Sequence, residues 1–443
     1  ANLEFALSTG NSYSAFYASS VSYPAPTLTG VDPTAFNTTG EPYVTLTGTN
    51  LGDSGSAAYD SCEVQYAYSY DSRNFSGCVD ASSSSSALVL PAPGYGTNMK
   101  WRLYVGNQWT SELNVNTNYY QPVIHGVTGP STLATVGGEL ITITGQNFYP
   151  FPNDDDVTTR VSRVTVNYGP SGNLSRYTCV PLQIEHDRIL CTTVEGTGKD
   201  LRFTVTLSNQ ASAASAVAYR YTSPSITGVT YATNPSTAGG TVVTITGTNL
   251  GNELGVVTLN YGPSLSPWES ANTTDTQSNC LNRASSNPGY TYAYSEFGLY
   301  LCGGAQCCQR TINPVDISQY TAQNCTFTSV HTTLECQLVA GVGENFVELT
   351  INSQKSGVFN DTAVTYGRPS LVTAAGNITM NTTGGQTVVL QGQNFGPIGT
   401  NVTADLRALD SRYYYTWIGC TVTTAHTHMS CTTQPGVGIE MAW

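Results

Sequence analysis

The sequence predicts an all-β protein made of tandem modules. Three observations lead to this fold class: one phrase recurs four times, apolar and polar residues alternate within it, and no helix-period stretch of useful length occurs. With 443 residues, the chain is too long for a single core and suits several domains of about 100 residues each. Only 10% of the residues are charged and β-formers are common, which favours folded modules over disorder.

The recurring phrase begins with a proline and a short apolar strand, passes through a turn that contains glycine, and ends in a strand closed by Gly-x-Asn-Leu/Phe. In the third copy, Val243 and Ile245 share one face of the strand, with threonines on the other, as in a half-buried strand. Gly247 then ends the strand at a position that would not readily accommodate a side chain. The asparagine two residues later tolerates the positive φ of the following turn. The copies span residues 26–52, 122–148, 224–251 and 369–396, and the other inward pairs are Val44 and Leu46, Ile141 and Ile143, and Val388 and Leu390.

A β-hairpin that ends in tyrosine closes each of the first three repeats, at residues 98–119, 201–221 and 346–366. Residues 1–23 have the same form, because apolar residues alternate from Leu3 to Leu7, a turn follows at 9–12, and the second strand ends in Tyr23. Residues 431–443 match 191–203 position for position, so the fourth repeat stops before its closing hairpin. We therefore expect a donor hairpin at 1–23 and domains at 24–120, 121–221, 222–366 and 367–443, with a cysteine-rich insertion at about 264–320.

Charge and sequons point to one compartment. The chain has 16 basic and 29 acidic residues, a net charge of -13, so a phosphate backbone would be repelled and nucleic acid is a poor partner. No apolar run is long enough to cross a bilayer and the N-terminus has no secretion signal, so we expect a mature or excised chain without membrane insertion. Sequons together with 12 cysteines predict an extracellular or cell-surface protein from the eukaryotic secretory pathway. The N-linked glycans are expected at Asn37, Asn74, Asn173, Asn272, Asn324, Asn360, Asn377, Asn381 and Asn401.

The cysteine spacing repeats with the modules. Separations of 12, 11 and 11 residues at one equivalent place fit disulfides across short hairpins, between Cys179 and Cys191, Cys325 and Cys336, and Cys420 and Cys431. In the first module Val89 takes the second position, so Cys78 is expected to pair with Cys62. The insertion cysteines are expected to pair among themselves in one of three ways; a zinc site would need two ligand pairs in a reducing compartment. These four are Cys280, Cys302, Cys307 and Cys308.

The Gly-Gly turn, the Val-x-Ile-x-Gly-x-Asn-Leu/Phe strand, the paired cysteines and the terminal tyrosine resemble IPT/TIG domains. The resemblance covers nearly the whole chain except the insertion. It implies immunoglobulin-like β-sandwiches, three complete and one split between the two chain termini. Such domains occur in plexin-like receptors, ciliary and cell-surface ectodomains, some bacterial and algal surface proteins, Rel-type transcription factors and starch-acting enzymes. The resemblance implies a spacer or interaction role, with no reaction and no cofactor.

Two weaker motifs resemble catalytic or metal-binding residues, and we favour a purely structural role for each. Gly52 to Gly55 (GDSG) resembles a serine-protease nucleophile motif, but its order relative to His426 and its place in a different sandwich argue against a triad. His186, His331 and His426 each precede the second cysteine of a pair by five residues, as polar turn residues would.

Two further clusters leave a binding role open. Asp154, Asp155 and Asp156 could bind calcium, but a solvated acidic loop is favoured, because the spaced ligands of a known calcium loop are absent. The aromatic cluster at Tyr290, Tyr292, Tyr294, Phe297 and Tyr300 either stacks on sugars or a neighbouring subunit, or packs on its own module.

The incomplete fourth module suggests a function. Without its last strands it would expose an apolar face and unpaired edges, while a lone hairpin at 1–23 is marginal in water. We therefore predict that the hairpin of one protomer completes the fourth module of the next, giving a head-to-tail homopolymer. The donor residues are Leu3, Phe5, Leu7, Phe16, Val21 and Tyr23, and the acceptor residues are Val388, Leu390, Met441 and Trp443. When the two termini are aligned with a complete repeat, residues 1–5 and 439–443 fall on the same positions. The alternative function is that the chain is a piece of a longer receptor or adhesin that binds protein or glycan ligands.

Overall fold

The structure is a computed structural model, and it confirms the all-β fold class. It forms two compact units, residues 1–194 with 199–220 and residues 195–198 with 221–443. Each sheet takes its strands from one predicted segment, and we refer to residues 24–120, 121–221, 222–366 and 367–443 as the first to fourth repeats. The described residues are 3–15, 17–19, 23–52, 63–68, 71–76, 78–150, 162–252, 255–263, 291–294, 300–303, 317, 319–374, 379–408, 414–437 and 441–442.

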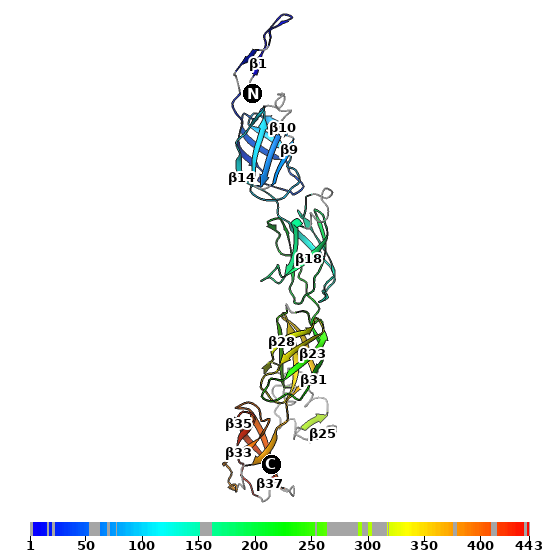
Figure 1. Cartoon of the computed structure of the whole chain (residues 1–443), viewed down its shortest axis with the longest axis vertical. Helices are drawn as coiled ribbons and strands as arrows, with labels where there is room; N and C mark the ends of the chain where they lie inside the picture. Colours follow the sequence, from blue (N-terminus) through cyan, green and yellow to red (C-terminus); the bar gives the residue numbers. More distant parts are fainter. Residues whose placement is uncertain are drawn as a thin grey trace. The chain divides into compact units, whose positions relative to one another are not determined.

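In the first unit, residues 1–23 form two small antiparallel pairs, β1 with β4 and β2 with β3, and the first repeat forms two facing sheets (Figure 1). One sheet has the order β10-β11-β7-β5 and the other β6-β14-β12-β8-β9, with β13 paired to β12. The strands are β1 (Leu3–Phe5), β2 (Ser8–Thr9), β3 (Ser12–Tyr13), β4 (Tyr17–Ser19), β5 (Thr27–Asp32), β6 (Ala35–Phe36), β7 (Val44–Thr49), β8 (Glu63–Tyr68), β9 (Asp71–Ser76), β10 (Cys78–Ser83), β11 (Ser86–Val89), β12 (Met99–Val105), β13 (Gln108–Trp109) and β14 (Leu113–Tyr119).

The second repeat forms one continuous sheet of order β15-β16-β19-β18-β17-β20-β21. It is continuous because β18 pairs with β19 through one part of its length and with β17 through another. The strands are β15 (Val123–Thr128), β16 (Leu140–Gln146), β17 (Val164–Gly169), β18 (Tyr177–Ile184), β19 (Arg188–Thr192), β20 (Arg202–Leu207) and β21 (Gln210–Ala211).

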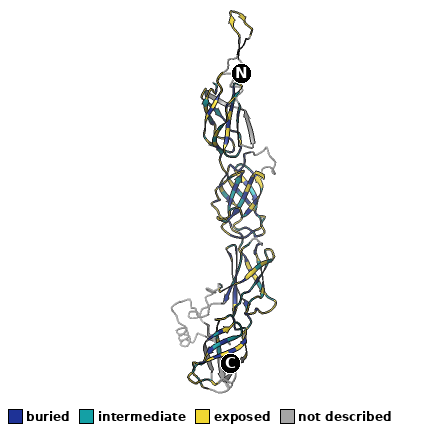
Figure 2. Ribbon diagram, turned by 60° about the vertical axis from the view of Figure 1, so that its left-hand side comes forward, coloured by how far each residue is buried: buried dark blue, intermediate teal, exposed yellow. Residues whose placement is uncertain are grey.

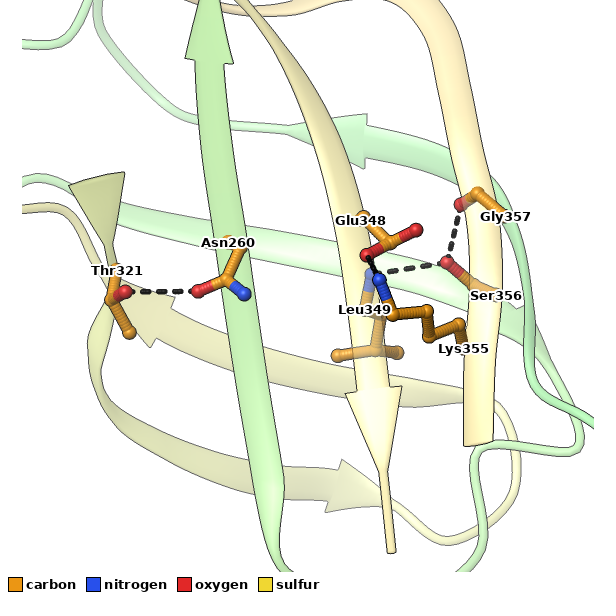
Figure 3. Close-up of polar contacts among 7 residues, drawn as sticks. All are labelled: Asn260, Thr321, Glu348, Leu349, Lys355, Ser356 and Gly357. Atoms are coloured by element: carbon orange, nitrogen blue, oxygen red, sulfur yellow. Dashed lines mark hydrogen bonds and ion pairs between the residues drawn. The ribbon is translucent and has the colours of Figure 1, made fainter. Parts of the chain in front are cut away.

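In the second unit, the third repeat has two sheets, β22-β23-β29-β28 and β27-β24-β30-β31, and the insertion contributes the separate pair β25-β26. Thr321 Oγ1 donates to Asn260 Oδ1 at 2.9 Å between β27 and β24 (Figure 3). The strands are β22 (Ser225–Thr230), β23 (Val242–Thr248), β24 (Val257–Pro263), β25 (Thr291–Tyr294), β26 (Tyr300–Gly303), β27 (Tyr320–Thr321), β28 (Gln323–Ser329), β29 (Thr333–Gln337), β30 (Glu344–Ile351) and β31 (Gln354–Thr365).

The fourth repeat is one sheet of order β32-β33-β36-β35-β34-β37. Its strands are β32 (Ser370–Ala374), β33 (Thr387–Gln393), β34 (Asn401–Ala408), β35 (Tyr414–Thr424), β36 (His428–Thr432) and β37 (Met441–Ala442).

The recurring phrase folds as its alternation predicts. Its last strand is β7, β16, β23 or β33, and all eight predicted inward side chains are at most 3% exposed. A Cβ on Gly247 would meet the carbonyl oxygen of Ser225, which explains the glycine that closes the strand. The following asparagines, Asn50, Asn147, Asn249 and Asn394, have φ between 58° and 62°.

Three disulfides join strands within their repeats. The pairs are Cys179–Cys191, Cys325–Cys336 and Cys420–Cys431. In the first repeat Cys78 lies opposite Val89, while Cys62 lies outside the described residues. Among the insertion cysteines, Cys302 lies opposite Tyr292 in the β25–β26 pair, and Cys280, Cys307 and Cys308 lie outside the described residues.

Candidate interaction surfaces

The closing hairpins share one hydrogen-bond pattern. In the third repeat, Ser356 Oγ accepts from the Leu349 N–H at 3.0 Å and donates to the Gly357 carbonyl at 2.7 Å, next to the ion pair of Lys355 with Glu348 (Figure 3). The N-terminal hairpin therefore has the local structure of a closing hairpin. The equivalent bonds are Leu7 N–H to Ser14 Oγ at 2.8 Å, Leu103 N–H to Thr110 Oγ1 at 3.0 Å and Val205 N–H to Ser212 Oγ at 3.0 Å.

The N-terminal hairpin nevertheless lacks the cover that the other closing hairpins have. Leu103, Val205 and Leu349 are completely buried, whereas Leu7 is 76% exposed. Residues 6–15 of the N-terminal hairpin are all exposed, and the hairpin is drawn in yellow (Figure 2). Tyr23 is likewise 75% exposed, although the other closing tyrosines are at most 3% exposed. Among the described residues, β1 to β4 pair only with one another.

The fourth repeat has the complementary feature, a stretch of β34 that has no strand partner on one edge among the described residues. In the second repeat β20 pairs with β17 along six residues, from Val164 to Gly169. In the fourth repeat β37 pairs with β34 only at Arg407 and Ala408, so within the described part of the chain residues 402–406 have no partner on that edge. Val402 and Ala404 from this stretch pack against the buried core of the repeat.

Contacts between consecutive repeats recur inside each compact unit, and we call them junction contacts. The first uses a glutamine in the turn of a closing hairpin. Gln210 Nε2 donates to the Tyr119 carbonyl at 2.7 Å, and its Oε1 accepts from the Gly96 N–H at 3.2 Å. In the second unit, Gln354 makes the same bonds to Tyr221 and Gly198, each at 2.7 Å. Gln108, at the matching position of the first repeat, donates to the Tyr23 carbonyl at 3.3 Å.

The second junction contact joins a threonine to a histidine. Thr38 Oγ1 lies 3.1 Å from His186 Nδ1 and donates to Asn147 Oδ1 at 3.3 Å. In the second unit, Thr237 Oγ1 lies 3.0 Å from His426 Nδ1. The histidines therefore do lie at hairpin turns, as predicted, and all three contact the preceding repeat. His186 and His426 do so through a threonine, whereas His331 Nε2 lies 3.6 Å from Glu195 Oε2.

The third junction contact places a β-branched side chain against a glycine. Within the second unit, a Cβ on Gly251 would overlap Thr197, and a Cβ on Gly396 would overlap Val342. Both glycines have positive φ, 78° and 95°, so the backbone and the neighbour both require glycine.

The predicted donor and acceptor residues fall in different places. Leu3 and Phe5 lie on β1, and Phe16, Val21 and Trp443 lie outside the described residues. Val388 and Leu390 are 3% and 0% exposed, because Val422 and Met429 of their own repeat pack with them. These two acceptor residues therefore lie under side chains of their own repeat. Among the described residues, the stretch without a strand partner is on β34, and Met441 lies on β37 beside it.

The other candidate residues form no assembled site in the part of the chain that is described. Asp154 to Asp156, Tyr290 and Phe297 lie outside the described residues, while Tyr294 lies opposite Tyr300 in the β25–β26 pair. In the described part of the chain, no three histidine, cysteine or carboxylate side chains gather as a metal site. No described helix is long and apolar enough to cross a membrane.

The predicted sequon asparagines are mostly at the surface where their side chains are described. Asn173, Asn324, Asn381 and Asn401 are exposed, and Asn37 is half-buried. Asn272 and Asn377 lie outside the described residues, and Asn74 and Asn360 lie in strands.

Sequence reasoning did not find the junction glutamines and threonines. The signal was present, because Gln108, Gln210 and Gln354 occupy one position of the repeat, as do Thr38 and Thr237. Their side chains act on the neighbouring repeat, however, and the repeat pattern alone carries no information on how repeats stack.

Comparison with known families matches residues 122–221 to the IPT/TIG domain, which confirms that prediction for the second repeat. Comparison with curated proteins found no match. Among solved structures, the chain is similar to the plexin A4 full extracellular region (15% identity, TM-score 0.24, 93% of this chain and 34% of that chain). It is also similar to invasin, a bacterial integrin-binding protein (12% identity, TM-score 0.22, 88% and 78%), and to a surface glycan-binding protein from Prevotella bryantii (14% identity, TM-score 0.27, 45% and 43%). The chain spans about one third of the length of the plexin A4 structures.

Proposed function

We propose that this chain, which contains an IPT/TIG domain at residues 122–221, is a structural subunit of an extracellular glycosylated filament or surface appendage. Subunits join head to tail when the N-terminal hairpin of one completes the fourth repeat of the next. The observation that carries the proposal is the exposure of Leu7. This residue is 76% exposed, whereas the other three closing hairpins bury the residue at the same position completely.

The open edge of β34 suits this donor. Matching the fourth repeat to the pairing of β20 with β17 sets Phe5 opposite Leu406, Leu7 opposite Ala404 and Thr9 opposite Val402. The aligned overlap of residues 1–5 with 439–443 then becomes a division of one strand position, with β37 covering residues 407–408 and the donor covering 402–406. The edge of β34 would thus pair with strands from two chains, its own β37 and the donated hairpin of another copy.

Disulfides and exposed sequons support the compartment. Structural disulfides persist in oxidising environments, and the chain holds three within its repeats. Exposed asparagines such as Asn173 and Asn401 could carry N-linked glycans added in a eukaryotic secretory pathway. The IPT/TIG domain describes a binding or spacer module and assigns no reaction to the chain.

The test uses the purified chain, a variant without residues 1–23, and the free peptide 1–23. We expect the chain to form polymers that denaturant separates into single chains, whose mass after removal of N-linked glycans is that of residues 1–443. We expect the deletion variant to stay monomeric and to bind the peptide. Leu7→Asp should abolish peptide binding, whereas Ser8→Asp, on the opposite face of the strand, should retain it.

Polymers that persist without residues 1–23 would contradict strand donation. Native material of much greater covalent mass would instead favour the alternative, in which these repeats belong to a longer receptor or adhesin that binds protein or glycan ligands.

A further inference from the structure

We infer that the first and fourth repeats carry the two halves of an end-to-end docking surface that binds a second copy of this chain. The half on the fourth repeat, the tail face, contains Thr382 and Val437. The half on the first repeat, the head face, contains Asn50, Gly52 and Gln108. The inference rests on the proposed head-to-tail polymer and adds a contact between folded repeats to the donated hairpin.

The tail face presents residues that internal repeats bury. Thr38 and Thr237, which bind histidines of the following repeat, are 0% and 1% exposed, whereas Thr382 at the matching position is exposed. Thr197, which packs against Gly251, is 3% exposed, whereas the side chain of Val437 at its matching position is 59% exposed.

The head face shows the same difference. Asn147 accepts from Thr38 and is 4% exposed, whereas Asn50 at the matching position is exposed. Gly52 has φ of 91°, close to the values of Gly251 and Gly396, and can receive a β-branched side chain in the same way.

Gln108 connects this surface to the hairpin. Its amide already donates to the Tyr23 carbonyl, as Gln210 and Gln354 do to Tyr119 and Tyr221. The N-terminal hairpin thus meets the first repeat through the bond that joins a completed repeat to its successor. When this hairpin completes the fourth repeat of another copy, that copy's tail face is brought to the head face, with Val437 against Gly52 and Thr382 beside Asn50.

One position departs from the internal pattern. Ser84 stands where the later repeats have His186, His331 and His426, and its carbonyl accepts from the Leu51 N–H at 2.9 Å, as the His186 carbonyl does from Phe148 at 3.0 Å. The backbone is the same, but the side chain is too short to reach a threonine as His186 and His426 do. The contact between copies therefore lacks the histidine–threonine hydrogen bond that these two internal junctions make.

The first experiment places a charge in the docking surface of the full chain. Val437→Arg is expected to raise the dissociation constant for the association of one copy with the next at least tenfold, as measured by sedimentation. Val389→Arg, at a side chain 45% exposed on β33, should change it less than twofold. Protection of the amides of residues 402–406 from hydrogen exchange measures strand donation independently of the docking surface.

The outcomes distinguish the two proposals. An unpolymerised wild-type chain with unprotected 402–406 amides would overturn strand donation and, with it, this inference. A polymerising wild type with protected amides, together with a Val437→Arg variant that behaves like Val389→Arg, would overturn only the docking surface.

A gain-of-contact variant tests the same surface without disrupting it. Ser84→His restores the histidine of the internal junctions and should tighten association about fivefold, the size of one ordinary net hydrogen bond. Ser85→His, one residue along the same turn, should not. The gain should vanish when Ser84→His is combined with Thr382→Val, which keeps the Asn381 sequon; a gain that survives Thr382→Val would contradict the proposed pairing.

Discussion

Tyr366 stabilises the end of the third repeat through its hydroxyl group. This hydroxyl lies 2.9 Å from that of Tyr261 and donates to the Val339 carbonyl at 2.6 Å, while the Val339 N–H donates to Tyr261 Oη at 3.0 Å. Burial raises the pKa of both tyrosines, so both hydroxyls stay protonated at physiological pH. The first repeat has the same arrangement at Tyr66 and Tyr119.

We predict that Tyr366→Phe lowers the free energy of unfolding of the third repeat by about 1–3 kcal/mol, because it removes the hydroxyl that donates to the partly buried Val339 carbonyl and that pairs with the Tyr261 hydroxyl. Urea denaturation followed by hydrogen exchange of β30 amides measures the loss. Tyr120→Phe is the control, since Tyr120 is 46% exposed. Equal stability of the two variants would show that the tyrosine pair contributes no more than its ring packing.

At the scale of elements, we expect the fourth repeat to depend on its disulfide more than the third repeat does. Among the residues whose burial is described, its core consists of Val388, Leu390, Phe395, Cys420, Val422, Met429 and Cys431, with no contribution from a closing hairpin. The third repeat, by contrast, buries Val347, Leu349 and Ile351 from β30. A smaller core leaves less stability to offset the loss of a cross-link.

Replacing Cys420 and Cys431 by alanine should cost about 2.5–3 kcal/mol, the effect expected for closing a loop of 11 residues. We expect the fourth repeat of this variant to open before the others, seen as faster hydrogen exchange in β33 and β36. The same change at Cys325 and Cys336 is the matched control, with an equal cost but slower opening. A fourth repeat that exchanges no faster than the third would contradict the reasoning from core size.

The positions of the strands were the feature of the molecule that the sequence predicted best. The period-two alternation located β7, β16, β23 and β33, because an inward residue such as Ile245 must be apolar wherever one sheet face is buried. The acceptor surface was less predictable. Val388 and Leu390 were named both as an inward pair and as acceptor residues, and side chains from β35 and β36 pack with this pair. The stretch without a strand partner among the described residues lies on β34 instead.

At the scale of the whole molecule, charge opposes assembly. Each copy carries a net charge of -13, so copies that meet end to end repel one another over distances set by the salt concentration. The junction contacts described above are mainly neutral, formed by amide, hydroxyl and imidazole groups and by a β-branched side chain against glycine. Salt should therefore weaken the repulsion more than the contact.

We predict that raising the salt concentration from about 20 to 300 mM, where the Debye length falls well below 10 Å, lengthens the polymers formed at a fixed protein concentration. Sedimentation velocity measures the length distribution, and the variant without residues 1–23 reports any salt effect that does not depend on the donated hairpin. An interface held by opposite charges would respond in the other direction, with shorter polymers at high salt. That response would mean that the minority of basic residues, 16 against 29 acidic, is concentrated where the copies meet.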